Sequence, residues 1–140
     1  APVYIAWSAK NRTPLIRIPG SRGEGTRVEL RSPDPSANPY LALAVCLAAG
    51  LDGIKHEIMP PHSIDCNIYE MTEQERMDAG IENLPGSLLE AAKEFEKDAF
   101  IQDVLGEDLS KKYIKAKTKE YEDYRAQVTE WELGKYLHRL

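Results

Sequence analysis

An α+β fold is predicted for this chain from three observations. In residues 3–31, apolar and polar side chains alternate with the period of two that β-strands have. Residues 40–49 form an apolar run directly after Asn38-Pro39, a pair typical of helix starts. From Glu107 onward, apolar side chains recur every seven residues, as on one face of a long helix. We expect short antiparallel strands at the N-terminal end packed on a buried helix, then a mostly helical C-terminal half.

Composition narrows the class of protein. The 140 residues fit one domain with a single core, and the net charge of −5 argues against general nucleic-acid binding. No apolar run approaches the about 20 residues of a membrane span, and no signal segment opens the chain. Cys46 and Cys66 lack metal-ligand spacing. We therefore expect two reduced thiols in a cytoplasmic protein that contacts neither membrane nor nucleic acid.

Three strands are expected near the N-terminus, because turn residues separate the alternating segments. Asn11-Arg12 before Pro14 indicates a turn, and the glycine-rich residues 20–25 indicate a flexible loop. Short connections of this kind are typical of antiparallel strands. The expected strands are residues 3–8, 15–19 and 26–31.

The expected helices follow from capping signals. The first, from Pro39 to about Lys55, is apolar nearly all round, so we expect it to be buried against the sheet. Thr72 with Glu75, and Ser87 with Glu90, have the three-residue spacing of a helix start. Later helices are expected over residues 88–97 and 107–137, with a short helix or turn over residues 98–105 between them.

The third strand carries the most informative pattern. Arg27, Glu29 and Arg31 alternate with Val28 and Leu30, so the three charged side chains share one face while the two apolar ones face a core. Arginine grips carboxylates and phosphates through its planar fork. With two further arginines, Arg12 and Arg17, on neighbouring segments, this face predicts a site for anions.

Two interpretations of Glu29 remain open from the pattern alone. As a structural partner it bridges Arg27 and Arg31; as a ligand it holds Mg²⁺ or Mn²⁺ beside phosphate oxygens. The loop at residues 20–25 lacks the terminal Lys-Ser/Thr of a phosphate-binding loop, so a hairpin connection is expected there. The three histidines have no metal-ligand spacing and are expected to be exposed: His56, His62 and His138.

Several longer segments together resemble one known family. The segments are APVYIAWS at residues 1–8, NRTPLIRIP at 11–19, TRVELRSPDP at 26–35, ANPYLALA at 37–44, AGLDGIK at 49–55, NIY at 67–69 and LPGSL at 84–88. They resemble the C-terminal part of the catalytic domain of bacterial type I glutamine synthetase, and the resemblance runs the length of the chain.

That resemblance implies an enzyme that joins ammonia to glutamate at the expense of ATP through γ-glutamyl phosphate. By the same resemblance, Arg12 is a catalytic residue that contacts ATP and glutamate, Arg17 and Arg27 bind ATP, and Arg31 binds glutamate. Glu29 then becomes a ligand of one divalent ion, Mg²⁺ or Mn²⁺.

The resemblance also implies partners and regulation. The family forms a homo-oligomer of twelve subunits in two stacked hexameric rings, and some members bind a nitrogen-responsive regulator. Tyr69 matches a tyrosine that certain relatives adenylylate, whereas its surroundings, NIYEMTEQER, resemble more the subgroup controlled by feedback inhibition and by protein partners. One departure is Glu24, which stands near the position of a lysine close to the nucleotide in some relatives.

By resemblance, residues 1–140 are part of the catalytic domain, with active-site strands and the buried helix in residues 1–56 and a helical region in residues 57–140. Further ligands of the metal and the ammonia site then lie in a preceding segment, so the isolated chain is expected to be inactive. The alternative is an interaction module, in which the helical region, especially the tail at residues 130–140, docks other subunits or a regulator.

Overall fold

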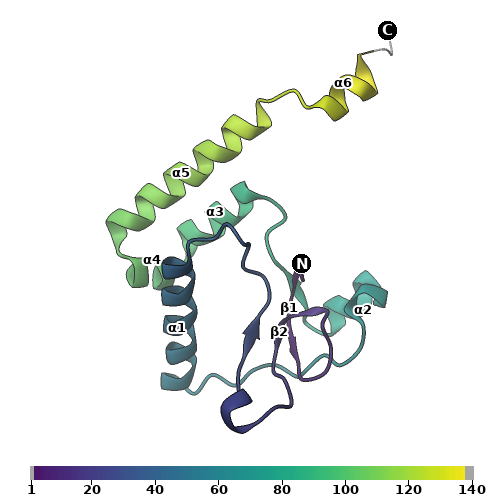
Figure 1. The fold of residues 1–140 in the computed structure, drawn as a ribbon, viewed down its shortest axis with the longest axis vertical. Helices are drawn as coiled ribbons and strands as arrows, with labels where there is room; N and C mark the ends of the chain where they lie inside the picture. The colour runs from purple at the N-terminus through teal and green to yellow at the C-terminus, as the bar shows by residue number, and fades with distance from the viewer. Residues whose placement is uncertain (1, 138–140) are drawn as a thin grey trace. The chain divides into compact units, whose positions relative to one another are not determined.

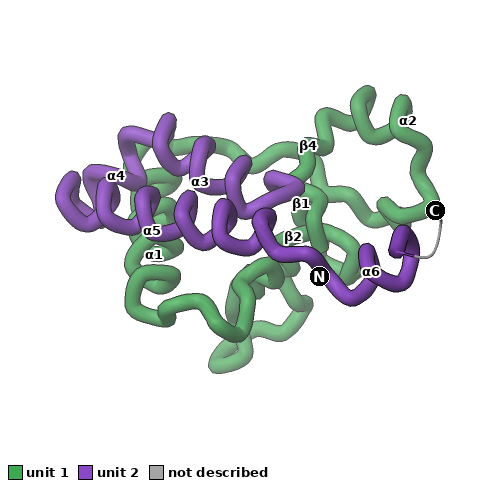
Figure 2. Tube along the Cα trace, turned by 90° about the horizontal axis from the view of Figure 1, so that it is seen from above, with its two compact units in different colours: residues 1–84 green, residues 85–140 purple. Residues whose placement is uncertain are grey.

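The computed structural model describes residues 2–137, and within them the α+β class is confirmed (Figure 1). The chain divides into two compact units, residues 1–84 and residues 85–140, which Figure 2 shows in different colours. The first unit contains the β-sheet, and the second contains helices only. All candidate binding residues named above lie in the first unit.

The sheet is mixed rather than antiparallel. Its four strands are β1 (Tyr4–Ser8), β2 (Pro14–Arg17), β3 (Glu29–Leu30) and β4 (Glu82–Asn83), in the order β3-β2-β1-β4. β1 pairs antiparallel with β4, and β2 pairs antiparallel with β3. β1 and β2 are parallel, so the expectation of antiparallel pairing was wrong for these two strands.

The parallel pair is unusual because its connection, residues 9–13, is short. Such short links normally join antiparallel strands. Here the chain runs back along β1, so that Tyr4 pairs with Pro14 and Ser8 with Arg17. The backbone N–H groups of Lys10 and Asn11 donate to Ser8 Oγ at 3.1 and 3.0 Å, and these bonds hold the return.

The core of the first unit is small. Leu15, Ile68 and Ile81 are buried there, together with Pro14. Val28 and Leu30 were expected to face this core, but 65% and 39% of their surface is exposed. The third strand is shorter than expected, since β3 contains only Glu29 and Leu30 and Val28 lies outside it.

Helix α1 (Pro39–Lys55) has the expected bounds but not the expected burial. Asn38 caps it, since Asn38 Oδ1 accepts hydrogen bonds from the backbone N–H groups of Tyr40 and Leu41 at 3.0 and 3.3 Å. No residue of α1 is buried, so the expectation of a helix buried against the sheet was wrong. A helix that is apolar all round needs cover on every face. One face is largely exposed, with Tyr40, Leu43, Leu47, Leu51 and Ile54.

The rest of the first unit follows its capping signals. A 3₁₀ turn (Ile68–Glu70) leads to the short helix α2 (Glu73–Asp78). The capping box of Thr72 and Glu75 is present, with both reciprocal hydrogen bonds formed. The strand β4 was not predicted, because its two polar residues carry no periodic signal.

The second unit contains α3 (Leu88–Lys97), α4 (Ala99–Leu105), α5 (Glu107–Arg125) and α6 (Glu130–Tyr136). Ser87 caps α3 as expected. α3 packs against α5, where the Phe95 and Tyr113 rings lie 6.0 Å apart in an edge-on arrangement.

The long terminal helix expected over residues 107–137 is interrupted. α5 ends at Arg125, and α6 starts anew at Glu130. Thr129 and Glu132 form a capping box, which favours a fresh helix start over a continuous helix. None of the helices in residues 2–137 combines the length and apolarity needed to cross a membrane.

Candidate functional site

The candidate site lies on β2 and β3, where Arg17 stands opposite Glu29 in the strand register. The Arg17 guanidinium contacts one Glu29 oxygen at 3.1 Å, and the Arg27 guanidinium contacts the other at 2.7 Å. The side chains of Arg17 and Glu29 are 23% and 29% exposed, and that of Arg27 is 50% exposed. Arg17, Arg27 and Glu29 therefore form one partly buried group, called here the arginine cluster.

The electrostatics of this cluster favour a further anion. Hydrogen bonds from Arg17 and then from Arg27 hold the pKa of Glu29 below its usual range, so its carboxylate is ionised at neutral pH. Two guanidiniums then face one carboxylate, which leaves one positive charge in excess. Arg17 Nε is buried and has no hydrogen-bond partner among residues 2–137. An oxygen of a phosphate or carboxylate would satisfy this donor.

Arg31 and Arg12 form a second contact. The Arg31 guanidinium donates a hydrogen bond to the Arg12 carbonyl oxygen, and the Arg31 N–H donates to the Leu15 carbonyl oxygen at 2.9 Å. The Arg12 side chain is exposed. The carboxylate of Glu29 bridges Arg17 and Arg27. The expected partner Arg27 is confirmed, but the expected partner Arg31 was wrong, since Arg17 takes its place.

The glycine-rich loop is more ordered than expected. Residues Gly23–Gly25 form a 3₁₀ turn, and Gly23 has φ of 67°, a conformation that favours glycine. The Arg27 guanidinium donates to the Gly25 carbonyl oxygen at 3.1 Å. The loop is therefore tied to the arginine cluster.

A divalent ion does not find a complete ligand set here. Within residues 2–137, no group of three or more His, Cys, Asp or Glu side chains is placed to hold a metal. Glu29 has the hard oxygen atoms that Mg²⁺ and Mn²⁺ prefer, but it is a single carboxylate and both oxygens already accept from arginines. The described residues thus fit at most one ligand position.

The polar side chains that hold the Arg12 segment were not predicted from the sequence. Ser8 is fully buried and donates to Asp65 Oδ1 at 2.6 Å. Asn11 Nδ2 donates to Thr13 Oγ1 at 2.8 Å and to the Cys66 carbonyl oxygen. Ser, Asn and Asp favour turns through such bonds. The only sequence signal was the turn at Asn11, since Asp65 is far away along the chain.

The remaining candidates lie elsewhere. Tyr69 is 58% exposed, and its ring meets the Tyr4 ring edge-on at 5.5 Å. Cys46 and Cys66 are exposed and free. His56 and His62 are exposed as expected, and His138 lies outside the described residues.

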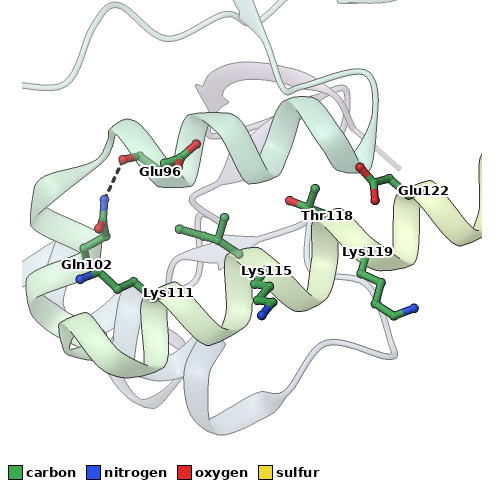
Figure 3. A pocket seen from close by; sticks show the side chains of 8 residues that line it. Glu96, Gln102, Lys111, Lys115, Thr118, Lys119 and Glu122 are labelled. Carbon is green, nitrogen blue, oxygen red and sulfur yellow. Dashed lines mark hydrogen bonds between the residues drawn. The ribbon is translucent and has the colours of Figure 1, made fainter.

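A surface hollow between α3, α4 and α5 has no convergent polar groups (Figure 3). The Gln102 side chain donates to the Glu96 carbonyl oxygen at 2.8 Å, as the dashed line in Figure 3 marks. Lys111 and Lys119 pair with acidic residues one turn away on their own helix. The hollow therefore resembles a solvated helix face and carries no candidate site.

Comparison with known proteins gives one consistent result. The family model described as glutamine synthetase, catalytic domain, matches residues 1–136. The chain is 54% identical over 138 residues to the glutamine synthetase of Thermotoga maritima, and 53% identical over 139 residues to that of Clostridium saccharobutylicum. Each alignment covers 99% of this chain and 31% of the relative.

A solved structure agrees in fold. The structure titled "Apo GmaS without ligand" is 39% identical to this chain, with a TM-score of 0.80. The match covers 98% of this chain and 30% of that one. The chain thus spans less than a third of the length of these relatives.

Proposed function

The chain belongs to the glutamine synthetase catalytic-domain family, and we propose that its arginine cluster forms one side of a site where glutamate, ammonia and ATP react. The reaction is the ATP-dependent ligation of ammonia to glutamate through γ-glutamyl phosphate. The carrying observation is the pair of guanidiniums on Glu29, together with the buried, unpartnered Arg17 Nε. The working location that we propose is the cytoplasm.

Each arginine receives a role in this proposal. Arg17 and Arg27 bind the phosphates of ATP, because they carry the excess positive charge of the cluster. Arg12 contacts the transferring phosphate and glutamate, since its side chain is exposed beside this strand. Arg31 binds glutamate from the neighbouring segment. Phosphoryl transfer depends mainly on such positioning and charge neutralisation.

Glu29 contributes one ligand of a divalent ion in this proposal. A bound Mg²⁺ or Mn²⁺ would neutralise charge on the phosphate oxygens. The other ligands come from parts of a longer catalytic domain, because residues 2–137 offer no further cluster. Glu29 would exchange at least one arginine contact for the metal. Tyr69 remains a proposed site of modification, and its exposed ring is compatible with that role.

A graft tests the proposed function. The 140-residue chain alone is expected to form no γ-glutamyl hydroxamate, since it offers a single carboxylate to the metal. When residues 1–140 replace the matched segment of the Thermotoga maritima relative, the graft is expected to form glutamine. Activity is measured with glutamate, ammonia and ATP, beside the unmodified relative. An assembled graft without activity, or an active isolated chain, contradicts the proposal.

A second candidate function, docking of other subunits or of a nitrogen-responsive regulator, is favoured by α6. Its apolar side chains are largely exposed: Trp131 (66%), Leu133 (44%) and Tyr136 (55%). Aromatic residues of this kind are enriched at protein interfaces. We propose that α6 contributes to a homo-oligomer, which for this family is a dodecamer of two hexameric rings.

Deletion of residues 130–140 from the graft is expected to shift its mass from the full ring assembly to smaller species. The reason is that α6 exposes apolar area and makes no extensive contact with another helix or strand among the described residues. Sedimentation velocity measures the change. An unchanged mass together with unchanged regulator binding rules this candidate out.

A further inference from the structure

We infer that Ser8 and Asp65 are positioning residues for Arg12, an inference that rests on the proposed function. They hold the short return between β1 and β2, on which Arg12 lies. The Ser8 and Asp65 side chains hydrogen-bond to each other, whereas Glu29 accepts its side-chain hydrogen bonds from Arg17 and Arg27. The effect of Ser8 and Asp65 on the reaction passes through the backbone of the Arg12 segment.

The hydrogen bonds of Ser8 carry the first step. Ser8 is fully buried, and its hydroxyl donates to Asp65 Oδ1 at 2.6 Å. Ser8 Oγ in turn accepts hydrogen bonds from the backbone N–H groups of Lys10 and Asn11. Asp65 thereby fixes the direction of the Ser8 hydroxyl and leaves its lone pairs free for both amides.

The segment containing Asp65 also contacts the other side of the return. The Ile64 N–H donates to the Trp7 carbonyl oxygen at 2.9 Å, and the Trp7 indole donates to the Pro61 carbonyl oxygen at 2.7 Å. The Ile68 N–H donates to Thr13 Oγ1 at 3.3 Å. Residues 61–68 therefore support the return along its whole length.

The geometry explains why Arg12 needs this support. A short link between parallel strands has no hydrogen-bond ladder of its own, and residues 9–13 belong to no strand. The Arg12 carbonyl oxygen already accepts from Arg31, which fixes the residue from the side of β3. Displacement of a reacting group by about 1 Å costs on the order of 100-fold in rate. Loss of the Ser8–Asp65 bond is expected to permit a smaller displacement of Arg12, with a correspondingly smaller loss of rate.

The 140-residue chain itself tests the contact. In Asp65→Ala, hydrogen exchange at the Lys10 and Asn11 amides is expected to rise about tenfold, because the Ser8 hydroxyl loses its orientation. Asp65→Asn retains an acceptor oxygen and is the matched control, with exchange close to the parent. Ser8→Ala serves if Asp65→Ala does not fold. Unchanged exchange in the folded variants overturns the inference.

The graft tests the consequence for the reaction through a double-mutant cycle. Arg12→Ala alone is expected to lower kcat/KM about 100-fold, and Asp65→Ala alone about tenfold. In the Arg12→Ala background, Asp65→Ala is expected to change kcat/KM by less than about twofold. Asp65→Asn restores most of the activity.

Two outcomes separate the inference from the proposed function. Additive losses, or a lower Tm without a change in kcat/KM, overturn the positioning role of Asp65. An Arg12→Ala graft with full activity overturns the proposed role of Arg12 instead, and with it the premise of the inference.

Discussion

Replacing Glu29 with alanine in the graft is expected to raise the Mg²⁺ concentration needed for half-maximal activity by at least about 100-fold. A carboxylate that binds the ion directly contributes more to metal affinity than the supporting residues around a metal site do. The same change leaves Arg17 and Arg27 facing each other without their shared carboxylate. ATP binding without metal is therefore expected to tighten or to stay unchanged.

This experiment separates the two interpretations of Glu29. As a structural partner alone, Glu29 can be replaced by glutamine with little loss, because an amide oxygen still accepts from one arginine. As a metal ligand, Glu29→Gln should lose most of the metal affinity. Glu94→Ala is the matched control, since Glu94 forms an exposed ion pair with Lys97 at 2.6 Å on α3. A lower Tm with an unchanged Mg²⁺ requirement contradicts the ligand role.

Replacing Leu47 with aspartate is expected to destabilise the isolated chain slightly and the graft strongly. Leu47 is 65% exposed on α1, so in the isolated chain the change should cost less than about 1 kcal/mol of unfolding free energy. We propose that the remainder of the catalytic domain covers this face in the longer protein. An unpaired buried charge there costs about 3–5 kcal/mol.

The length of the relatives supports the proposal that other parts of the catalytic domain cover this face of α1, since the chain matches only 31% of each relative. Leu47→Met, which keeps the apolar character and volume, is the matched control and should be neutral in both proteins. Chemical denaturation measures the isolated chain, and soluble yield and sedimentation measure the graft. A Leu47→Asp graft that assembles normally contradicts the proposed cover.

Local signals in the sequence predicted the helices well. Asn38, Thr72 and Ser87 cap helices where their side chains satisfy backbone amides within the next turn. Such signals lie within four residues, so a single sequence contains them. The exposure of α1 in this chain could not be predicted from the sequence. The apolar pattern of the helix indicates that every face needs cover, but it does not indicate which residues provide that cover.

Pairing between distant segments was the harder part. β1 and β2 pair in parallel, and Ser8 at the end of β1 hydrogen-bonds to Asp65; nothing in the spacing of Ser8 and Asp65 indicates this contact. The shared face of Arg17 and Glu29 was anticipated from strand alternation. The pairing of Glu29 with Arg17, and not with Arg31, was not anticipated, because it follows from the register between β2 and β3.

The position of manganese in a crystal of the graft with Mn²⁺ and a non-hydrolysable ATP analogue tests most directly whether Glu29 binds the metal beside the phosphates. Anomalous scattering locates the ion without assumptions about its ligands. We expect one Mn²⁺ within coordinating distance of the Glu29 carboxylate, with phosphate oxygens bonded to Arg17 and contacting Arg12. Manganese remote from Glu29, with both arginine contacts of Glu29 intact and the phosphates elsewhere, would contradict the account.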